Sequence, residues 1–203
     1  MLTNAQIRAK ARESLAGKWK PAVIHFLLYM IVMMIISSVT NKIHYIGWAI
    51  GILLEAPLAY GLYNHYLDFA RSQVPEPRGI FRGFERYKET LILYVAIIVF
   101  TLLWTLLFVI PGIIAAFRYS QSYYILRDNP GLTPMEAINR SKAMMAGYKW
   151  KLFMLYLSFI GWALLCILTL GIGFLWLGPY YSTAAGHFYE QLRGQQGQGG
   201  SAY

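Results

Sequence analysis

The chain has 203 residues, of which 57% are hydrophobic and 13% are charged, and its formal net charge is +9. Soluble domains carry about a quarter charged residues, so this composition argues against a soluble domain and favours a membrane protein built from helices. The basic residues flank apolar segments, so we expect anionic lipid headgroups rather than nucleic acid as their partner. Because Cys166 is the sole cysteine, the sequence excludes an intrachain disulfide.

The first third of the sequence predicts a surface helix followed by two membrane spans. An amphipathic helix is expected over residues 3–16, where Thr3 and Gln6 form a capping box and Gly17 is a C-terminal stop. Its position and composition allow it to lie on the membrane surface. The next apolar runs predict spans over residues 21–40 and 45–69, and the first of these is not expected to be a cleaved signal.

The middle of the sequence predicts a basic loop and a second pair of spans. A proline-containing loop over residues 71–88 precedes a span over residues 90–109. Pro111 and Gly112 predict a tight turn or kink. The following segment, residues 113–126, is short and polar for a membrane span. If this segment and the region around Glu55 do not fully cross, four spans remain instead of six.

The last third repeats the order of the first. Residues 133–146 predict a second amphipathic helix, with a capping box at Thr133 and a stop at Gly147. Spans are expected over residues 152–170 and 174–192. The Gly- and Gln-rich residues 194–203 predict a disordered cytoplasmic tail after a single membrane domain over residues 1–193.

The basic residues predict the orientation of the spans. With six spans, all of the 18 Lys and Arg residues except Lys42 and Arg118 fall on one side of the membrane. Because basic residues are retained in the cytoplasm, both termini are predicted to be cytoplasmic.

Internal similarity predicts three repeat units, over residues 3–71, 72–127 and 133–193. Each unit would be a two-helix hairpin, and because each hairpin enters and leaves on one side, the units would be parallel. The expected fold is therefore all-α, a polytopic membrane bundle of about six transmembrane helices with two amphipathic surface helices. A basic-aromatic-basic triplet precedes each hairpin, and these residues are expected to anchor it at the headgroups. The nine anchor residues are Lys18, Trp19, Lys20, Arg86, Tyr87, Lys88, Lys149, Trp150 and Lys151.

Charged residues inside predicted spans mark the first candidate site. Burying a charge at the centre of a membrane helix costs about 2.5–3.5 kcal/mol, so such residues often have a function. Glu55 and Arg118 have opposite charge and are predicted either to pair or to line a polar cavity with Gln121. The alternative places Glu55 at a helix end and lets Arg118 reach the interface.

A second candidate site consists of two His/acid pairs with the same spacing. His65 with Asp68, and His187 with Glu190, each lie on one helix face. Two such faces meeting in a bundle would offer imidazoles and carboxylates to a metal. Polar helix ends at the interface are the favoured interpretation, so no metal, cofactor or catalytic residue is predicted.

Long stretches of the sequence resemble the bacterial membrane proteins of the domain-of-unknown-function 975 family. The matching stretches are ARESLAGKWK, APLAYGLYNHYLDFAR, IFRGFERYKETL, LLWTLLFVIPGIIAAFRYSQSYYILRDNP, TPMEAINRSKAMMAGYKWKLF and LSFIGWALLCILTLGIGFLWLGPYYSTAAGHFYEQL. The resemblance implies a multi-pass protein of the bacterial cytoplasmic membrane. It supplies no reaction, ligand or site residue.

Two functions are considered on these grounds. The first is a non-enzymatic accessory or envelope-homeostasis protein, with a homo-oligomer or another membrane protein as a possible partner. The alternative is a small transporter or permease-like protein for a lipid or small solute. It is favoured by the predicted parallel repeats, by the helix-breaking prolines and by Glu55 with Arg118.

Overall fold

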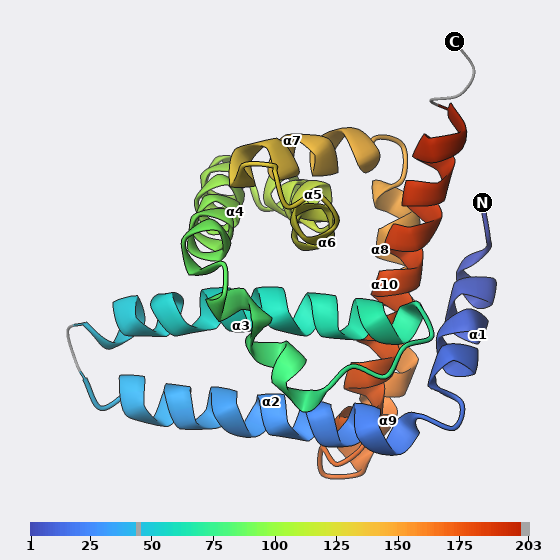
Figure 1. The fold of residues 1–203 in the computed structure, drawn as a ribbon, viewed down its shortest axis with the longest axis horizontal. Coiled ribbons are helices and arrows are strands. Elements are labelled where there is room, and N and C mark those ends of the chain that lie inside the picture. Colours follow the sequence, from blue (N-terminus) through green and yellow to red (C-terminus); the bar gives the residue numbers. More distant parts are fainter. Residues whose placement is uncertain (44–45, 200–203) are drawn as a thin grey trace.

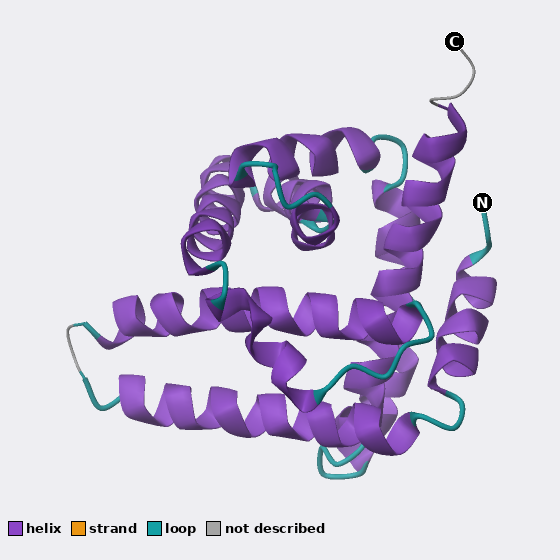
Figure 2. Ribbon diagram, in the orientation of Figure 1, coloured by secondary structure: helices purple, strands orange, loops and turns teal. Residues whose placement is uncertain are grey.

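The chain folds into helices throughout the part that the structure describes, residues 1–43 and 46–199 of a computed structural model (Figure 1; Figure 2). The first segment contains α1 (Asn4–Leu15), α2 (Trp19–Thr40) and α3 (Gly47–Ala70). The second contains the 3-10 helix η1 (Pro77–Phe84), α4 (Tyr87–Leu107), α5 (Val109–Tyr119) and α6 (Ser122–Asp128). The third contains α7 (Pro134–Met144), α8 (Lys149–Leu157), α9 (Ile160–Leu168) and α10 (Phe174–Gly199).

Both capped helices predicted from the sequence are confirmed. Complete capping boxes begin α1 at Thr3 and α7 at Thr133. Gly17 and Gly147 follow these helices with φ angles of +73° and +79°. Glycine is favoured there because the left-handed conformation that ends a helix strains other residues.

The apolar faces of the two capped helices pack against protein. In α1, Ile7, Ala11 and Leu15 are fully buried, and α1 packs on α10. In α7, Ala137 and Ile138 are fully buried, and α7 packs on α6 and α4. This corrects the expectation that α1 would rest its apolar face on the membrane surface, because that face is already covered by neighbouring helices.

Three helices are long and apolar enough to cross a membrane. They are α2, α4 and the stretch Lys149–Leu168, in which a short turn at residues 158–159 separates α8 from α9. Little of their surface is buried within the protein, and large apolar side chains such as Met34, Leu106 and Leu168 are exposed. Exposed apolar surface of this extent is typical of a face that meets lipid or another protein.

The helices that follow them form the core. Tyr66 and Phe69 of α3, and Phe188 and Tyr189 of α10, are at most 1% exposed. The helix α3 also packs closely against η1. A Cβ atom at Gly61 of α3 would lie 1.7 Å from a backbone carbonyl oxygen of η1. The first and last hairpins therefore pair an exposed apolar helix with a partly buried one, whereas in the middle segment α5 is largely exposed and the buried helix is α6.

The hairpins point in different directions. In Figure 1, α2 and α3 run across the view, α8 to α10 run up it, and α4 and α5 are seen nearly end-on. The sequence predicts three parallel hairpins instead. The buried helices contact one another, whereas α2, α4 and α9 have few contacts with each other. Close packing thus joins the bases of the hairpins and leaves their tips apart.

The fourth predicted span is broken. The sequence predicts one helix over residues 113–126, but α5 ends at Tyr119 and α6 begins at Ser122. Ser141 of α7 stabilises the break, because its hydroxyl donates to the Arg118 carbonyl at 2.7 Å and accepts from the Gln121 amide at 3.2 Å. These bonds replace the helical ones that the break removes.

Other boundaries also differ from the prediction. The turn before α5 lies at Phe108, which is extended, and Pro111 falls in the first turn of α5, where a missing N–H is tolerated. The fifth span is interrupted between α8 and α9. The helix α10 continues to Gly199, so the predicted disordered tail is helical up to that residue. The predicted start of the second span at residue 45 and the tail residues 200–203 lie outside the described residues.

Candidate functional site

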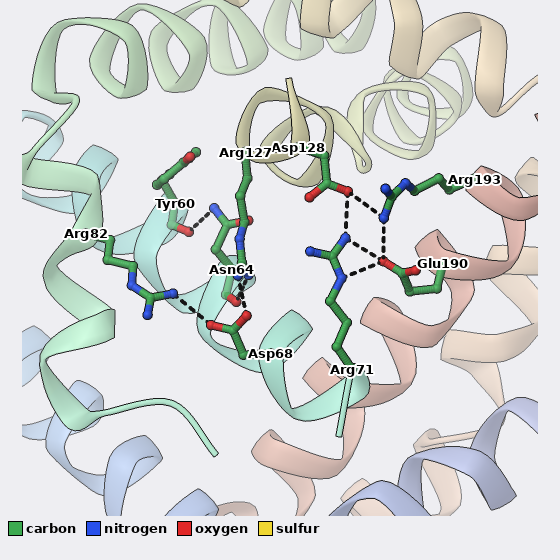
Figure 3. A network of polar contacts seen from close by, with 9 residues as sticks. All are labelled: Tyr60, Asn64, Asp68, Arg71, Arg82, Arg127, Asp128, Glu190 and Arg193. Carbon is green, nitrogen blue, oxygen red and sulfur yellow. Dashed lines mark hydrogen bonds and ion pairs between the residues drawn. The ribbon is translucent and has the colours of Figure 1, made fainter. Parts of the chain in front are cut away.

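Charged side chains meet where the core helices of all three hairpins converge, as Figure 3 shows. They come from the C-terminal ends of α3 and α6, from η1 and from α10. We call this cluster the ionic hub. Its members are Asp68, Arg71, Arg82, Arg127, Asp128, Glu190 and Arg193.

One half of the ionic hub is centred on Asp68, whose side chain is 4% exposed. One carboxylate oxygen accepts from Arg82 at 2.7 Å, and the other accepts from Arg127. Arg127 also donates to the backbone carbonyl of Asn64. A carboxylate buried this deeply is stable only with such partners, so Asp68 joins α3 to both η1 and α6.

The other half is centred on Arg71, which follows α3. Its guanidinium donates to Asp128 at 2.6 Å and to Glu190 at 2.7 and 2.9 Å. Tyr189 also donates to Asp128, at 2.9 Å, and the guanidinium of Arg193 lies 3.3 Å from the same carboxylate. Arg71 therefore connects α3 with both α6 and α10.

The charges around Asp128 determine its protonation. Burial by itself would raise the pKa of this carboxyl, but the hydrogen bond and charge of Arg71, the Tyr189 hydroxyl and Arg193 outweigh burial and hold the pKa below its usual value. Asp128 is thus a fixed negative charge at neutral pH. The arrangement favours holding helices together over proton transfer.

The two histidines that the sequence offered as metal-ligand candidates do not join the ionic hub. His65 faces His25 of α2, with 2.9 Å between their ring nitrogens, and its other nitrogen has no partner among the described residues. His187 contacts the Ser14 hydroxyl at 2.8 Å. Asp68 and Glu190 are engaged by arginines instead. Within residues 1–43 and 46–199, no three His, Cys, Asp or Glu side chains gather as a metal site would require.

The three residues considered for an intramembrane polar site have different partners in the structure. Glu55 accepts a hydrogen bond from the Tyr94 hydroxyl at 3.1 Å. Arg118 is half-buried, and no ion pair joins it to Glu55 in the described part of the chain. Gln121 is 1% exposed and contacts Ser120 at 2.8 Å. The ion pair between Glu55 and Arg118, one of the arrangements that the sequence allowed, is not present among the described residues.

A cavity of 680 Å³ lies between the hairpins, and we call it the tyrosine cavity. Helices α3, α4, α5, α6, α8 and α10 all contribute to its wall. The tyrosines that line it are Tyr63, Tyr94, Tyr119, Tyr123, Tyr156 and Tyr181. The wall also includes Thr101, whose hydroxyl is buried without a hydrogen-bond partner among the described residues. Neither Glu55, Arg118 nor Gln121 lines the tyrosine cavity, although Glu55 touches it through Tyr94.

The predicted headgroup anchors have different environments. Lys20, Lys88 and Trp150 are exposed, as an anchor would be, and Tyr87 is at the limit of exposure. Lys149 and Lys151 are partly buried.

Three of the anchors instead contact the protein. Arg86 donates to the carbonyls of Leu126 and Pro130 at 3.2 and 2.9 Å. Lys18 donates to a loop carbonyl at 2.7 Å, and Trp19 packs edge-on against Tyr180. The triplets therefore also fasten the helix starts to the core.

The sequence carries signals for both clusters that single-residue arguments missed. Asp68 and Arg71 have the same spacing as Glu190 and Arg193, and these four positions meet in the ionic hub. The signal for the tyrosine cavity is the count of 16 tyrosines in a chain with long apolar helices. Neither signal indicates by itself which side chains touch.

Comparison with known proteins identifies a family and no closer relative. The family described as "Protein of unknown function (DUF975)" matches residues 1–115 and 98–196. No curated protein and no solved structure matches the chain.

Proposed function

The chain belongs to the DUF975 family, and we propose that it is a non-enzymatic integral membrane protein that acts as an accessory or envelope-homeostasis component. The observation that carries this proposal is the exposure of long apolar helices around a core formed by α3, α6 and α10. Three such apolar helices have the length and composition of membrane spans. The ionic hub lies at the opposite end of each hairpin from its tip, where basic residues would meet a cytoplasmic surface.

The proposed topology has the three hairpin tips on the far side of the membrane and both termini in the cytoplasm, which gives six spans. A helix of 22 residues is about 33 Å long, so it crosses about 30 Å of hydrocarbon when it stands nearly upright. Hairpins that point in different directions cannot all stand upright in the membrane, so their tips extend less deeply into the hydrocarbon layer than those of parallel hairpins. Crossing therefore requires the tips to come closer to parallel than they are in Figure 1.

Labelling of single cysteines tests this topology. In a Cys166→Ser background, Lys42→Cys lies near the first hairpin tip and Gln73→Cys lies near the ionic hub, and both positions are exposed. A membrane-impermeant maleimide should label position 42 in intact cells and position 73 in inverted vesicles. Labelling of both positions from the same side would contradict the proposal.

The non-enzymatic role is supported by the chemistry of the ionic hub. Its carboxylates are held by guanidinium groups, and the lowered pKa of Asp128 keeps that group from donating a proton at neutral pH. An accessory role predicts that native mass spectrometry from mild detergent shows a homo-oligomer or a second membrane protein. A monomer without any partner, together with unchanged sensitivity of a deletion strain to membrane-active agents, would contradict it.

A second candidate function is a small transporter for a lipid or small solute. The tyrosine cavity is the observation that favours it, because ligand sites are mostly apolar cavities with a few placed polar groups. Transport predicts uptake or efflux of a ligand by vesicles that contain the purified protein. If the cavity binds no ligand, the transporter function is excluded and the accessory role is the remaining candidate.

A further inference from the structure

We propose that the tyrosine cavity binds an amphipathic organic cation and that Glu55 supplies the opposing charge. This inference goes beyond an accessory role, which needs no ligand. It depends on the walls of the cavity and on the surroundings of Glu55, and not on how many helices cross the membrane. The ligand class is a quaternary or otherwise permanently charged centre with apolar or aromatic substituents.

The walls of the cavity present aromatic faces. The rings of Tyr63 and Tyr123 are stacked with 4.9 Å between centroids, and those of Tyr156 and Tyr181 lie 4.8 Å apart. Tyrosine faces attract cations through the ring quadrupole, and this attraction grows when water is excluded. Rings from α3, α6, α8 and α10 therefore bring several aromatic faces to the wall of one cavity.

The size and polarity of the cavity suit a small amphipathic molecule. Its volume of 680 Å³ falls within the range of about 300–1,000 Å³ that is typical of ligand sites. The buried hydroxyl of Thr101, on the wall formed by α4, has no partner among the described residues. A buried polar atom without a partner is unfavourable, so a ligand or water that contacts it would be stabilising.

Glu55 gives the site its preference for positive charge. Its carboxylate accepts from the hydroxyl of Tyr94, which lines the cavity, and it lies within electrostatic range of Tyr29. No Lys, Arg or His forms an ion pair with Glu55 in the described part of the chain. The five other acids without such a pair in the described part of the chain lie at or near helix ends, whereas Glu55 lies within α3 and contacts Tyr94 on the wall of the tyrosine cavity. A negative charge in this setting is stabilised by a cation.

A second cavity leads to the other side of Glu55. It has a volume of 440 Å³, lies at the turn between α2 and α3, and includes Ser37, Thr40 and Asn41 in its wall together with Glu55. Glu55 therefore lines a polar cavity near the hairpin tip and contacts the wall of the tyrosine cavity through Tyr94.

Basic side chains near the cavity indicate where the positive charge of the ligand would lie. The ammonium of Lys142 lies 5.7 Å from the ring centroids of Phe100 and Tyr119, which shows the same chemistry on one wall. Arg118 is half-buried beside that wall. Both are positive and would repel a second cation, so the charge of the ligand is expected near Tyr94 and Glu55.

Binding of tetraphenylphosphonium to the full chain in mild detergent tests the proposal. Triphenylphosphine oxide is the matched neutral probe, because it presents similar aromatic rings without the net charge. Isothermal titration calorimetry should show saturable binding of the cation at least about tenfold tighter than binding of the neutral probe. Equal affinity for the two probes, or no binding of the cation, would overturn the proposal.

Substitutions then locate the site. Glu55→Gln should weaken binding of the cation about tenfold and leave the neutral probe unaffected, whereas Glu85→Gln, which removes an exposed acid elsewhere, should change neither. Tyr123→Leu should weaken binding and Tyr123→Phe should preserve it, because a phenyl ring keeps the aromatic face. If Glu55→Gln fails to fold, Tyr123→Leu still decides. Retention of wild-type affinity by Tyr123→Leu or by a folded Glu55→Gln protein would refute the assignment.

Discussion

The ionic hub and the tyrosine cavity both border α3, but polar groups have several partners in the hub and few around the cavity. In the ionic hub, Asp68 is engaged through both carboxylate oxygens, and Arg71 contacts two acids. Around the tyrosine cavity, the Thr101 hydroxyl has no partner among the described residues, and Glu55 has one hydroxyl partner and no ion pair there. The C-terminal end of α3 is thus electrostatically satisfied, whereas its middle is not.

Because of this difference, we expect the ionic hub to contribute to stability and the tyrosine cavity to contribute to ligand binding. Removing one partner from a satisfied buried network leaves an uncompensated charge, so the ionic hub should govern stability. Groups that lack partners within the protein are available to a ligand, so the tyrosine cavity should govern binding. Substitutions in the two regions are expected to affect different measurements.

The largest expected effect is on stability and comes from Asp68→Asn. The substitution leaves Arg82 and Arg127 without their shared carboxylate and should lower the free energy of unfolding by about 3 kcal/mol. The midpoint of unfolding of the detergent-solubilised protein, followed by circular dichroism, measures it. Glu85→Gln is the control that removes an exposed acid. If the two variants are equally stable, the ionic hub does not hold the helices together.

The next effect depends on pH and involves Asp128. Its pKa is lowered in the folded protein, so its contribution to stability is fully present above the unfolded value of about 3.9 and is lost as the pH falls through the folded value. Asp128→Asn should therefore be less stable than the wild type at neutral pH, and the difference should shrink below about pH 4. Unfolding midpoints between neutral and acidic pH give this comparison. A difference that stays constant with pH would exclude a role of the Asp128 charge.

A smaller effect is expected at the edge of the ionic hub. Arg193 is 53% exposed and lies 3.3 Å from Asp128, so Arg193→Gln should reduce the free energy of unfolding by less than about 1 kcal/mol. Arg71→Gln is the matched substitution in the centre and should cost more, because Arg71 is better buried and contacts two acids. The same unfolding measurement compares them. Equal losses of unfolding free energy would mean that the contribution of a hub residue to stability does not depend on its burial.

The smallest effect on stability is expected in the tyrosine cavity. Tyr123→Phe removes a hydroxyl on the cavity wall and keeps the ring, so stability should change by less than about 0.5 kcal/mol. The free energies of unfolding of Tyr123→Phe and Asp68→Asn, measured in the same way, would show whether the two regions differ in their contribution to stability. A loss as large as that of Asp68→Asn would mean that the cavity wall is part of the stabilising core.

Local features of the fold could be predicted from the sequence. The capping boxes at Thr3 and Thr133 and the glycine stops depend on residues three to fourteen positions apart, and these predictions are confirmed. The three apolar helices follow from composition over about 20 residues. The break after Tyr119 was not predictable in this way, because the serine that stabilises it belongs to another helix, 20 residues further along the chain.

What the sequence by itself determined is the all-α class, the positions of the apolar helices and the helix caps, since each is set by near neighbours along the chain. The tertiary structure decided which charges meet. Asp68, a metal-ligand candidate in the sequence, forms ion pairs with Arg82 and Arg127, and Glu55 accepts from Tyr94 and forms no ion pair with Arg118 among the described residues. Spacing along a helix determines the face on which a side chain lies, whereas its partner depends on which helices pack against that face. The directions of the hairpins also follow from this packing, because the contacts at their bases orient them (Figure 1).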